Sequence, residues 1–191
     1  MSALTESSAR ARIACASCHP AGEQDRRLWD LNYTPGLHGP RYTPSLLGFG
    51  RIGIRTAMIA RAFEMETCAF DRSPEKPHQQ SAARRLGVRF SGLSGLLRES
   101  DVIAIQAPLD ASTHRLIGAP QIALMKPGAY LINVGRGNIV EEDALFHALR
   151  NGRIAGAALD VFAQEPALNH PLLTLDNFIG TPHIAGQTEE A

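Results

Sequence analysis

The sequence predicts an α/β domain with a doubly wound parallel sheet. Short apolar runs recur along the chain, segments of helical spacing lie between them, and polar or glycine-rich turns follow the runs. Each run is too short for a typical globular helix, and several are continuously apolar, as in strands buried on both faces. The expected strands are Ser45–Phe49, Thr67–Phe70, Val88–Phe90, Val102–Ala107, Tyr130–Val134, Gly156–Val161 and Phe178–Gly180.

The segments between these runs predict helices. Arg51–Met65 has apolar residues at spacings of three and four, namely Ile54, Ala57, Met58 and Ala62. Pro74–Leu86 ends at Gly87 and Glu141–Asn151 ends at Gly152, which are suitable C-terminal stops. One or two helical turns are expected in Leu93–Glu99 and Ala119–Met125. This alternation implies right-handed crossovers with helices on both faces of the sheet, as in a Rossmann-type domain.

Composition excludes several classes of protein. The chain has 191 residues, 44% of them hydrophobic, with 19 basic and 19 acidic side chains and a net charge of zero. A disordered chain would be less apolar, and a general nucleic-acid binder would be basic. No apolar run approaches a membrane span or a signal-peptide core, and 3 cysteines form no disulfide framework. We therefore expect a cytoplasmic globular protein without nucleic-acid or membrane partners.

The first part of the chain differs from the rest. Residues 1–43 are polar, rich in turn formers and without a sustained apolar period, whereas the strand and helix pattern covers residues 44–191. Sequence therefore predicts a polar lead-in over residues 1–43 followed by one α/β domain over residues 44–191.

A glycine motif joins the first expected strand to the first helix. Gly48 permits a tight turn, Gly50 lets the backbone approach a pyrophosphate, and Gly53 allows close packing of helix and strand. Amides at the helix start, at Arg51 and Ile52, then face the phosphates. Asp71 follows Gly53 by 18 residues and ends the second strand, where it can accept hydrogen bonds from a ribose diol. Its charge favours NAD over NADP, although the neighbouring Arg72 weakens that preference.

Three further polar residues follow the later strands. Arg136 lies between two glycines, Glu165 precedes a proline, and His183 follows the last strand in Thr181-Pro182-His183. Each residue taken alone is also consistent with a solvated loop. Together they provide a carboxylate-binding arginine, an acid–base histidine and an acid to assist it, which suits reversible hydride transfer to a 2-keto acid.

At these residues the sequence resembles the nucleotide-binding domain of the D-isomer-specific 2-hydroxyacid dehydrogenases, over about Leu46 to Ala191. The matching stretches are Leu47–Gly53, Leu124–Ala129, Asn133–Gly137, Gly152–Phe162, Glu165-Pro166 and Thr181–Gly186.

The resemblance implies a role for each matched position. His183 would be the acid–base, Glu165 would orient it and favour its protonated form, and Arg136 would bind the substrate carboxylate. Asp160 would contact the nicotinamide carboxamide, and Pro108 would line the cofactor cleft. Val134 and Gly135 would complete the NAD-binding set. The resemblance further implies a small 2-hydroxy or 2-keto acid substrate and a homodimer formed through this domain.

Some features depart from the family pattern. The second, flavodoxin-like lobe of the family is largely missing from these 191 residues. Pro44 stands where the first strand is usually longer, and proline is tolerated at a strand start but not inside a central strand. A catalytically incompetent NAD-binding module, like the C-terminal-binding-protein corepressors, and a truncated gene product therefore remain alternatives.

Cysteines near the N-terminus offer a different class of function. A C-x-x-C-H pattern, typical of c-type haem attachment or of half a zinc site, occurs at Cys15-Ala16-Ser17-Cys18-His19. No second pair of ligands with zinc spacing follows, so the expected metal content is none. Cys68, inside an expected strand, is interpreted as a small core residue.

Overall fold

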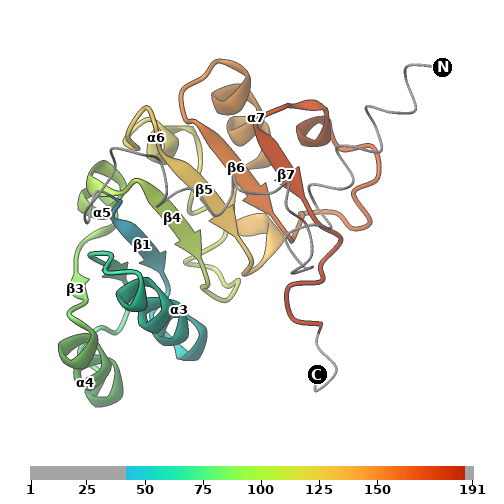
Figure 1. Ribbon diagram of the computed structural model, residues 1–191. Coiled ribbons are helices and arrows are strands. Elements are labelled where there is room, and N and C mark those ends of the chain that lie inside the picture. The colour runs from blue at the N-terminus through green and yellow to red at the C-terminus, as the bar shows by residue number, and fades with distance from the viewer. Residues whose placement is uncertain (1–41, 188–191) are drawn as a thin grey trace, which may run out of the picture. The chain divides into compact units, whose positions relative to one another are not determined.

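The sheet has seven strands, all parallel, in the order β3-β2-β1-β4-β5-β6-β7. A computed structural model describes residues 42–187 (Figure 1). The predicted lead-in over residues 1–43 lies almost wholly outside that range and stays a prediction. The strands are β1 (Pro44–Leu47), β2 (Cys68–Phe70), β3 (Arg89–Phe90), β4 (Val102–Ile105), β5 (Tyr130–Asn133), β6 (Gly156–Leu159) and β7 (Phe178–Gly180).

Every expected strand is present, but most end earlier than their apolar runs. Strand β6 stops at Leu159, although the sequence stays apolar at Val161, because its neighbours stop at the same level. Leu159 pairs with Asn133 on one side and with Gly180 on the other. Asp160 follows at the carboxyl end of the sheet, where its amide donates to the Asn133 carbonyl at 3.0 Å and its side chain is available to hold a loop.

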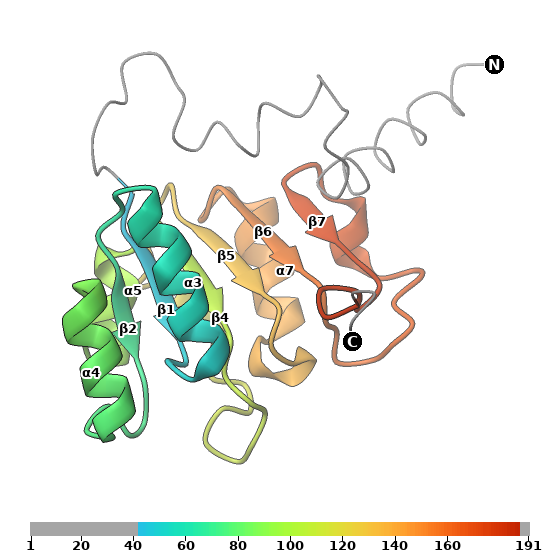
Figure 2. The same ribbon diagram turned by 60° about the horizontal axis from the view of Figure 1, so that its bottom comes forward.

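Helices cover both faces of the sheet, as predicted. Helices α3 (Arg51–Ala62) and α4 (Pro77–Leu86) lie together on one face, whereas α5 (Leu93–Glu99), α6 (Ala119–Ile122) and α7 (Glu142–Arg150) lie on the other (Figures 1 and 2). Short 3-10 turns occur at Gly137–Ile139 and Pro171–Thr174. The α3–α4 face packs on small residues such as Ala57, Ala82 and Ala83, and the opposite face holds the larger core around Leu96, Ile103 and Leu145.

Helix α3 buries only part of the apolar face that the sequence indicates. Of the four apolar residues at helical spacing, Ala57 is buried and Ile54 packs against the core, whereas Met58 and Ala62 are exposed. The other buried residues of the helix are Gly53 and Ala60. A Cβ atom on Gly53 would lie 2.2 Å from the Gly48 carbonyl oxygen, so the helix approaches β1 through its smallest residues. This close approach turns Met58 toward solvent and leaves Ile54 only partly buried.

Proline and glycine fix several element boundaries. Helix α4 begins at Pro77 rather than Pro74, because Pro77 occupies the first helical position, which needs no amide donor. It ends at Gly87, which has the left-handed φ of 70° expected of a glycine stop. Pro44 is the first residue of β1, a tolerated place in a central strand. Within residues 42–187, no helix has both the length and the apolar character needed to cross a membrane.

Candidate functional site

The candidate site lies at the carboxyl ends of the strands, around the point where the strand order reverses. Strand β1 has β2 on one side and β4 on the other, so successive crossovers leave β1 in opposite directions. Ligands of open α/β sheets bind in the crevice at such a switch point. Gly48 follows β1 and Pro108 follows β4, which places both at this crevice.

The glycine loop has the geometry that a pyrophosphate requires. Gly48 has a φ of 102°, and a Cβ atom there would lie 2.9 Å from the Ala107 amide nitrogen. At Gly50 a Cβ atom would meet nothing within 4 Å, so this position opens onto free space in front of the start of α3. The loop therefore fits a phosphate group held close to the backbone by the amides that begin α3.

Asp71 is fixed beside this loop. Its Oδ2 accepts a hydrogen bond from the Phe49 amide at 2.8 Å, and its Oδ1 accepts one from the Ser73 amide at 2.9 Å. Partial burial opposes ionisation, but these amide hydrogen bonds outweigh it and hold the pKa of Asp71 below its usual value. Each carboxylate oxygen keeps a second acceptor direction, so Asp71 can bind a ribose diol.

Gln79 of α4 braces the same loop, and sequence reasoning missed it. It is buried and donates from Nε2 to the Phe49 carbonyl at 3.1 Å. A glutamine within a polar helix gives no local signal of this role, because the contact joins residues 30 positions apart.

The other predicted cofactor residues line the crevice and are open to ligand. Arg51 and Ile52 are exposed at the start of α3, with Ile52 62% exposed. Pro108 is exposed after β4, and Val134 after β5 is 37% exposed. A Cβ atom on Gly135 would lie 2.9 Å from the Ala107 carbonyl, so β4 and β5 approach closely there. The NAD-binding assignment of these residues stays a prediction.

The structure brings His183 and Glu165 together. His183 Nδ1 lies 2.9 Å from Glu165 Oε2, and the two side chains are 48% and 36% exposed. Glu165 Oε1 also accepts a hydrogen bond from the Phe162 amide at 2.9 Å. That amide and the His183 ring hold the pKa of Glu165 below its usual value. The arrangement is an oriented imidazole with a carboxylate behind it, which can move a proton at the other ring nitrogen.

The backbone of His183 is in the left-handed region, with a φ of 59°. Non-glycine residues seldom adopt this conformation, and those that do are often functional. Asp160 supports the turn: it is 5% exposed, and its Oδ1 accepts from Thr181 Oγ1 at 2.6 Å and from the Ile184 amide at 2.8 Å. Its Oδ2 accepts from the Ala185 amide at 2.9 Å.

Asp160 is thus a positioning residue for the histidine turn. Burial opposes its ionisation, but the hydrogen bonds from Thr181, Ala185 and Ile184 outweigh burial and hold the pKa of Asp160 below its usual value. The nicotinamide contact implied by the family resemblance stays a prediction, and the bonds that Asp160 makes are to its own chain.

None of the described contacts of Arg136 is to His183 or Glu165. Its guanidinium is exposed and donates to the Gly135 carbonyl at 2.7 Å. Asn133, fully buried at the end of β5, donates to the Arg136 carbonyl at 2.9 Å and accepts from the Gly135 amide at 3.0 Å. Asn133 therefore fixes the backbone that carries Arg136. Sequence reasoning missed it, although a polar residue ending an apolar strand is a usable signal.

Two further features surround the histidine pair. His183 and Glu165 border a hollow of about 460 Å³, whose other walls include Leu168, Leu173 and Gly180. The loop bearing Glu165 is tied to α7, because Glu142 accepts from the Ala163 amide at 2.6 Å and lies 3.1 Å from His170 Nε2. A second His–Glu pair therefore anchors the loop of the first.

The described residues contain no cluster of metal-ligating side chains. Within 42–187, no group of three or more His, Cys, Asp or Glu side chains is arranged to hold a metal ion. The Cys15–His19 motif lies outside that range, so the haem and zinc alternatives stay untested. Cys68 is 1% exposed in β2, which confirms it as a core residue.

Comparison with known proteins identifies the family. Residues 19–185 match the family model for the D-isomer specific 2-hydroxyacid dehydrogenase, NAD binding domain. A glyoxylate reductase from Aeropyrum pernix is 46% identical over 149 residues, which cover 78% of this chain and 43% of that protein. The chain spans between 31% and 57% of the length of such curated relatives.

Solved structures agree with the family match. A D-lactate dehydrogenase from Aquifex aeolicus, complexed with NAD and lactic acid, superposes with a TM-score of 0.73 at 32% identity, over 97% of this chain and 60% of that one. An NADPH-dependent glyoxylate/hydroxypyruvate reductase from Sinorhizobium meliloti, in complex with NADP and malonate, gives 0.71 at 36%, over 80% and 45%. This chain therefore belongs to the D-isomer-specific 2-hydroxyacid dehydrogenase family and contains its NAD-binding domain.

Proposed function

We propose that the chain supplies the NAD-binding and proton-transferring part of an oxidoreductase that interconverts a D-2-hydroxy acid and its 2-keto acid. The observation that carries this proposal is the His183–Glu165 pair, held in a left-handed turn after β7, at the same carboxyl end of the sheet as the glycine loop. NAD, when bound, accepts the hydride in oxidation and NADH supplies it in reduction.

The proposed proton transfer uses the ring nitrogen of His183 that faces away from Glu165. Glu165 Oε2 accepts from Nδ1, which leaves Nε2 to give a proton to the keto oxygen or to take one from the hydroxyl. A negative Glu165 stabilises the imidazolium that donates the proton. The lowered pKa of Glu165 keeps it ionised across the neutral range, so it can assist His183 both in reduction of the keto acid and in oxidation of the hydroxy acid.

Arg136 is the proposed anchor of the substrate carboxylate. A guanidinium binds a carboxylate through two parallel hydrogen bonds, which fixes the plane of a 2-keto acid. The exposed Arg136 side chain, on a backbone clamped by Asn133, suits this role. Its present bond to the Gly135 carbonyl is one that a carboxylate ligand would replace.

The decisive experiment is turnover by the purified chain. Loss of NADH absorbance with glyoxylate, hydroxypyruvate or another 2-keto acid supports the oxidoreductase. NADH binding by calorimetry without reduction of any keto acid in the panel supports the alternative, an NAD-binding module of the same family. Failure to bind NADH contradicts both.

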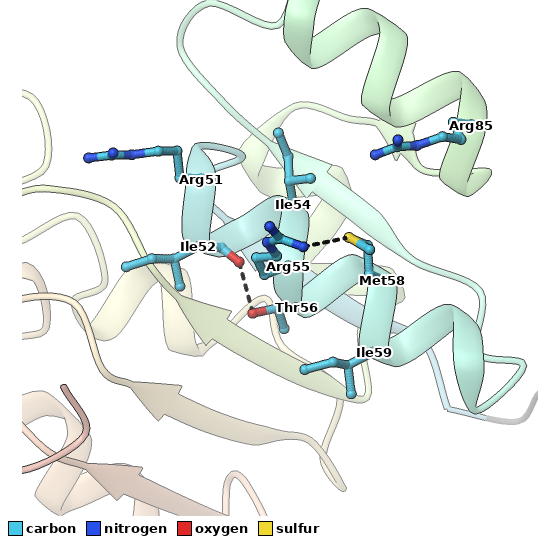
Figure 3. Close-up of a pocket in the computed structure, with 8 residues that line it drawn as sticks. All are labelled: Arg51, Ile52, Ile54, Arg55, Thr56, Met58, Ile59 and Arg85. Atoms are coloured by element: carbon cyan, nitrogen blue, oxygen red, sulfur yellow. Dashed lines mark hydrogen bonds between the residues drawn. The ribbon is translucent and has the colours of Figure 1, made fainter. Parts of the chain in front are cut away.

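We also propose that the chain forms a homodimer through α3. Ile52 and Ile59 on this helix are 62% and 60% exposed, and Phe63 directly after it is 54% exposed, an unusual concentration of large apolar side chains. Figure 3 shows Ile52, Met58 and Ile59 projecting from α3, with Arg85 coming from α4. An apolar centre with neighbouring arginines is the usual composition of a protein interface.

Sedimentation velocity tests the dimer. We expect a dimer for the wild type and a monomer for Ile59→Asp, which places a charge in the apolar centre. Leu168→Asp is the matched control, because Leu168 is 80% exposed on the distant loop after β6 and should leave the dimer intact. A monomeric wild type contradicts the proposal.

We also propose a cytoplasmic location for the protein. Cys68, a free and buried cysteine, is consistent with that location, and cell fractionation tests it.

A further inference from the structure

An ion pair joins the loops after β2 and β4 across the carboxyl end of β1. Arg72 Nη2 lies 2.8 Å from Asp110 Oδ2, and Arg72 Nη1 donates to Ser112 Oγ at 2.7 Å. Because β1 lies between β2 and β4 in the sheet, this contact spans the crevice that begins at Gly48. Both loops lie at the same end of the sheet, at the bottom of Figure 2.

Asp110 is built into its loop to face the arginine. Its Oδ1 accepts hydrogen bonds from the Ser112 amide at 2.8 Å and from Ser112 Oγ at 2.7 Å. These bonds leave Oδ2 for Arg72 and hold the pKa of Asp110 below its usual value. Ser112 therefore donates to Asp110 and accepts from Arg72 at the same time, which closes a small network.

Arg72 lies next to Asp71, the residue predicted to bind the cofactor ribose. It directly follows Asp71, whose carboxylate touches the Phe49 amide in the glycine loop and is placed for the ribose diol. An arginine near this position is a common partner for the 2′-phosphate of NADP. Arg72 is half-exposed, yet its guanidinium is engaged by Asp110 and Ser112.

We propose that Asp110 is a cofactor-specificity residue, which selects NAD by sequestering Arg72. The pairing draws the guanidinium toward the β4 loop and neutralises it, so that a 2′-phosphate meets Asp71 without a compensating cation. Asp110 also adds a second carboxylate to the same rim. This inference rests on the proposed NAD-dependent function and deepens it, because relatives of known structure include both NAD and NADP complexes.

Calorimetric titration of the full chain with NADH and with NADPH tests the inference without turnover. The wild type should bind NADH more tightly than NADPH. Asp110→Asn frees Arg72, and NADPH affinity should then rise about five- to tenfold at low salt, with NADH affinity little changed. Arg72→Ala alone should bring no gain for NADPH. In Arg72→Ala/Asp110→Asn the gain should vanish, since it depends on the arginine.

Matched variants keep the outcomes separate. Asp143→Asn removes one negative charge from an exposed position in the first turn of α7 and should leave the cofactor preference as in the wild type. If Asp110→Asn unfolds, Asp110→Ser takes its place, because the serine hydroxyl can still accept a hydrogen bond from the Ser112 amide.

An unchanged preference in a folded Asp110 variant, or a gain that persists without Arg72, overturns the inference while leaving the proposed function intact. A wild type that binds neither cofactor overturns the proposed function, and the inference with it.

Discussion

Asp160 holds the backbone on the carboxyl side of His183. Its Oδ1 accepts from the Ile184 amide at 2.8 Å, and its Oδ2 accepts from the Ala185 amide at 2.9 Å. The acid that the family resemblance assigns to the nicotinamide is thus bound to the turn that carries His183, the proposed acid–base. Asp160 directly follows Leu159, the last residue of β6, so the sheet fixes the position from which this carboxylate holds the histidine turn.

Asp160→Asn tests this support. An amide nitrogen would face backbone donors, so we expect unfolding free energy to fall by about 2–4 kcal/mol. Displacement of the imidazole should lower kcat by roughly 100-fold. Asp143→Asn is the control, and urea denaturation and steady-state kinetics are the measurements. Wild-type kcat in a folded Asp160→Asn protein would contradict the positioning role.

Replacing the histidine separates chemistry from cofactor binding. We expect His183→Ala to lower kcat by about 10²- to 10⁴-fold, because no other described side chain forms a pair with Glu165 in this turn. NADH affinity should stay close to the wild type. Glu165→Gln should lower kcat by roughly 10- to 100-fold, since glutamine can orient the ring but cannot stabilise its cation. Normal turnover by His183→Ala would remove the acid–base assignment.

Asp71→Asn tests the ribose assignment. The substitution replaces an acceptor oxygen by a donor and removes a charge, so we expect NADH affinity to fall about tenfold. Calorimetry with NADH measures the loss, and a thermal melt checks that the Phe49 loop is still formed. Equal NADH affinity before and after the change would show that Asp71 is not the ribose ligand.

The glycines of the cofactor loop should fail in different ways. Gly50→Ala has room and an ordinary backbone, so the chain should fold normally and lose cofactor affinity, because the added methyl group occupies the phosphate space. Gly53→Ala would place its Cβ atom 2.2 Å from the Gly48 carbonyl, so we expect a stability loss of about 1–3 kcal/mol or more. Gly128→Ala, with open space around it, is the control for both measurements. Tight NADH binding by Gly50→Ala would contradict the assigned phosphate site.

Stability should decline on the acid side. The pKa values of Asp71, Asp160 and Glu165 are lowered in the folded chain, so their contribution is fully present at neutral pH. As pH falls through about 4, the unfolded chain takes up protons first, and stability is lost until the folded pKa values are passed. Urea midpoints between pH 7 and pH 3 measure this decline, and Asp160→Asn should make it shallower. Midpoints that rise toward acid would contradict the assignment.

Sequence periodicity was sufficient for the sheet and insufficient for the loops. All the expected strands exist because buried parallel strands must be apolar on both faces, and Gly87 and Gly152 stop their helices as predicted. Two of the four apolar positions expected on α3, Met58 and Ala62, are exposed, because the helix packs through Gly53, Ala57 and Ala60 and Gly53 lies against the Gly48 carbonyl. Local pattern carries no record of such contacts.

The family resemblance implied one contact of the candidate site, that of Glu165 with His183, and the structure confirms it. Polar positions after each strand indicated Asp71, Glu165 and His183, since parallel strands bring those ends to one edge. Contacts between loops, such as Arg72 with Asp110, depend on which strands are neighbours, and 38 residues separate that pair.

The left-handed conformation of His183 has a consequence for protein engineering. A β-carbon in this backbone region costs about 1–2 kcal/mol, so glycine is the residue that the turn itself would favour. His183→Gly should therefore be more stable than His183→Ala, while leaving a vacancy shaped for a ring. Added imidazole should bind in that space and restore proton transfer, so turnover by His183→Gly should increase with the imidazole concentration.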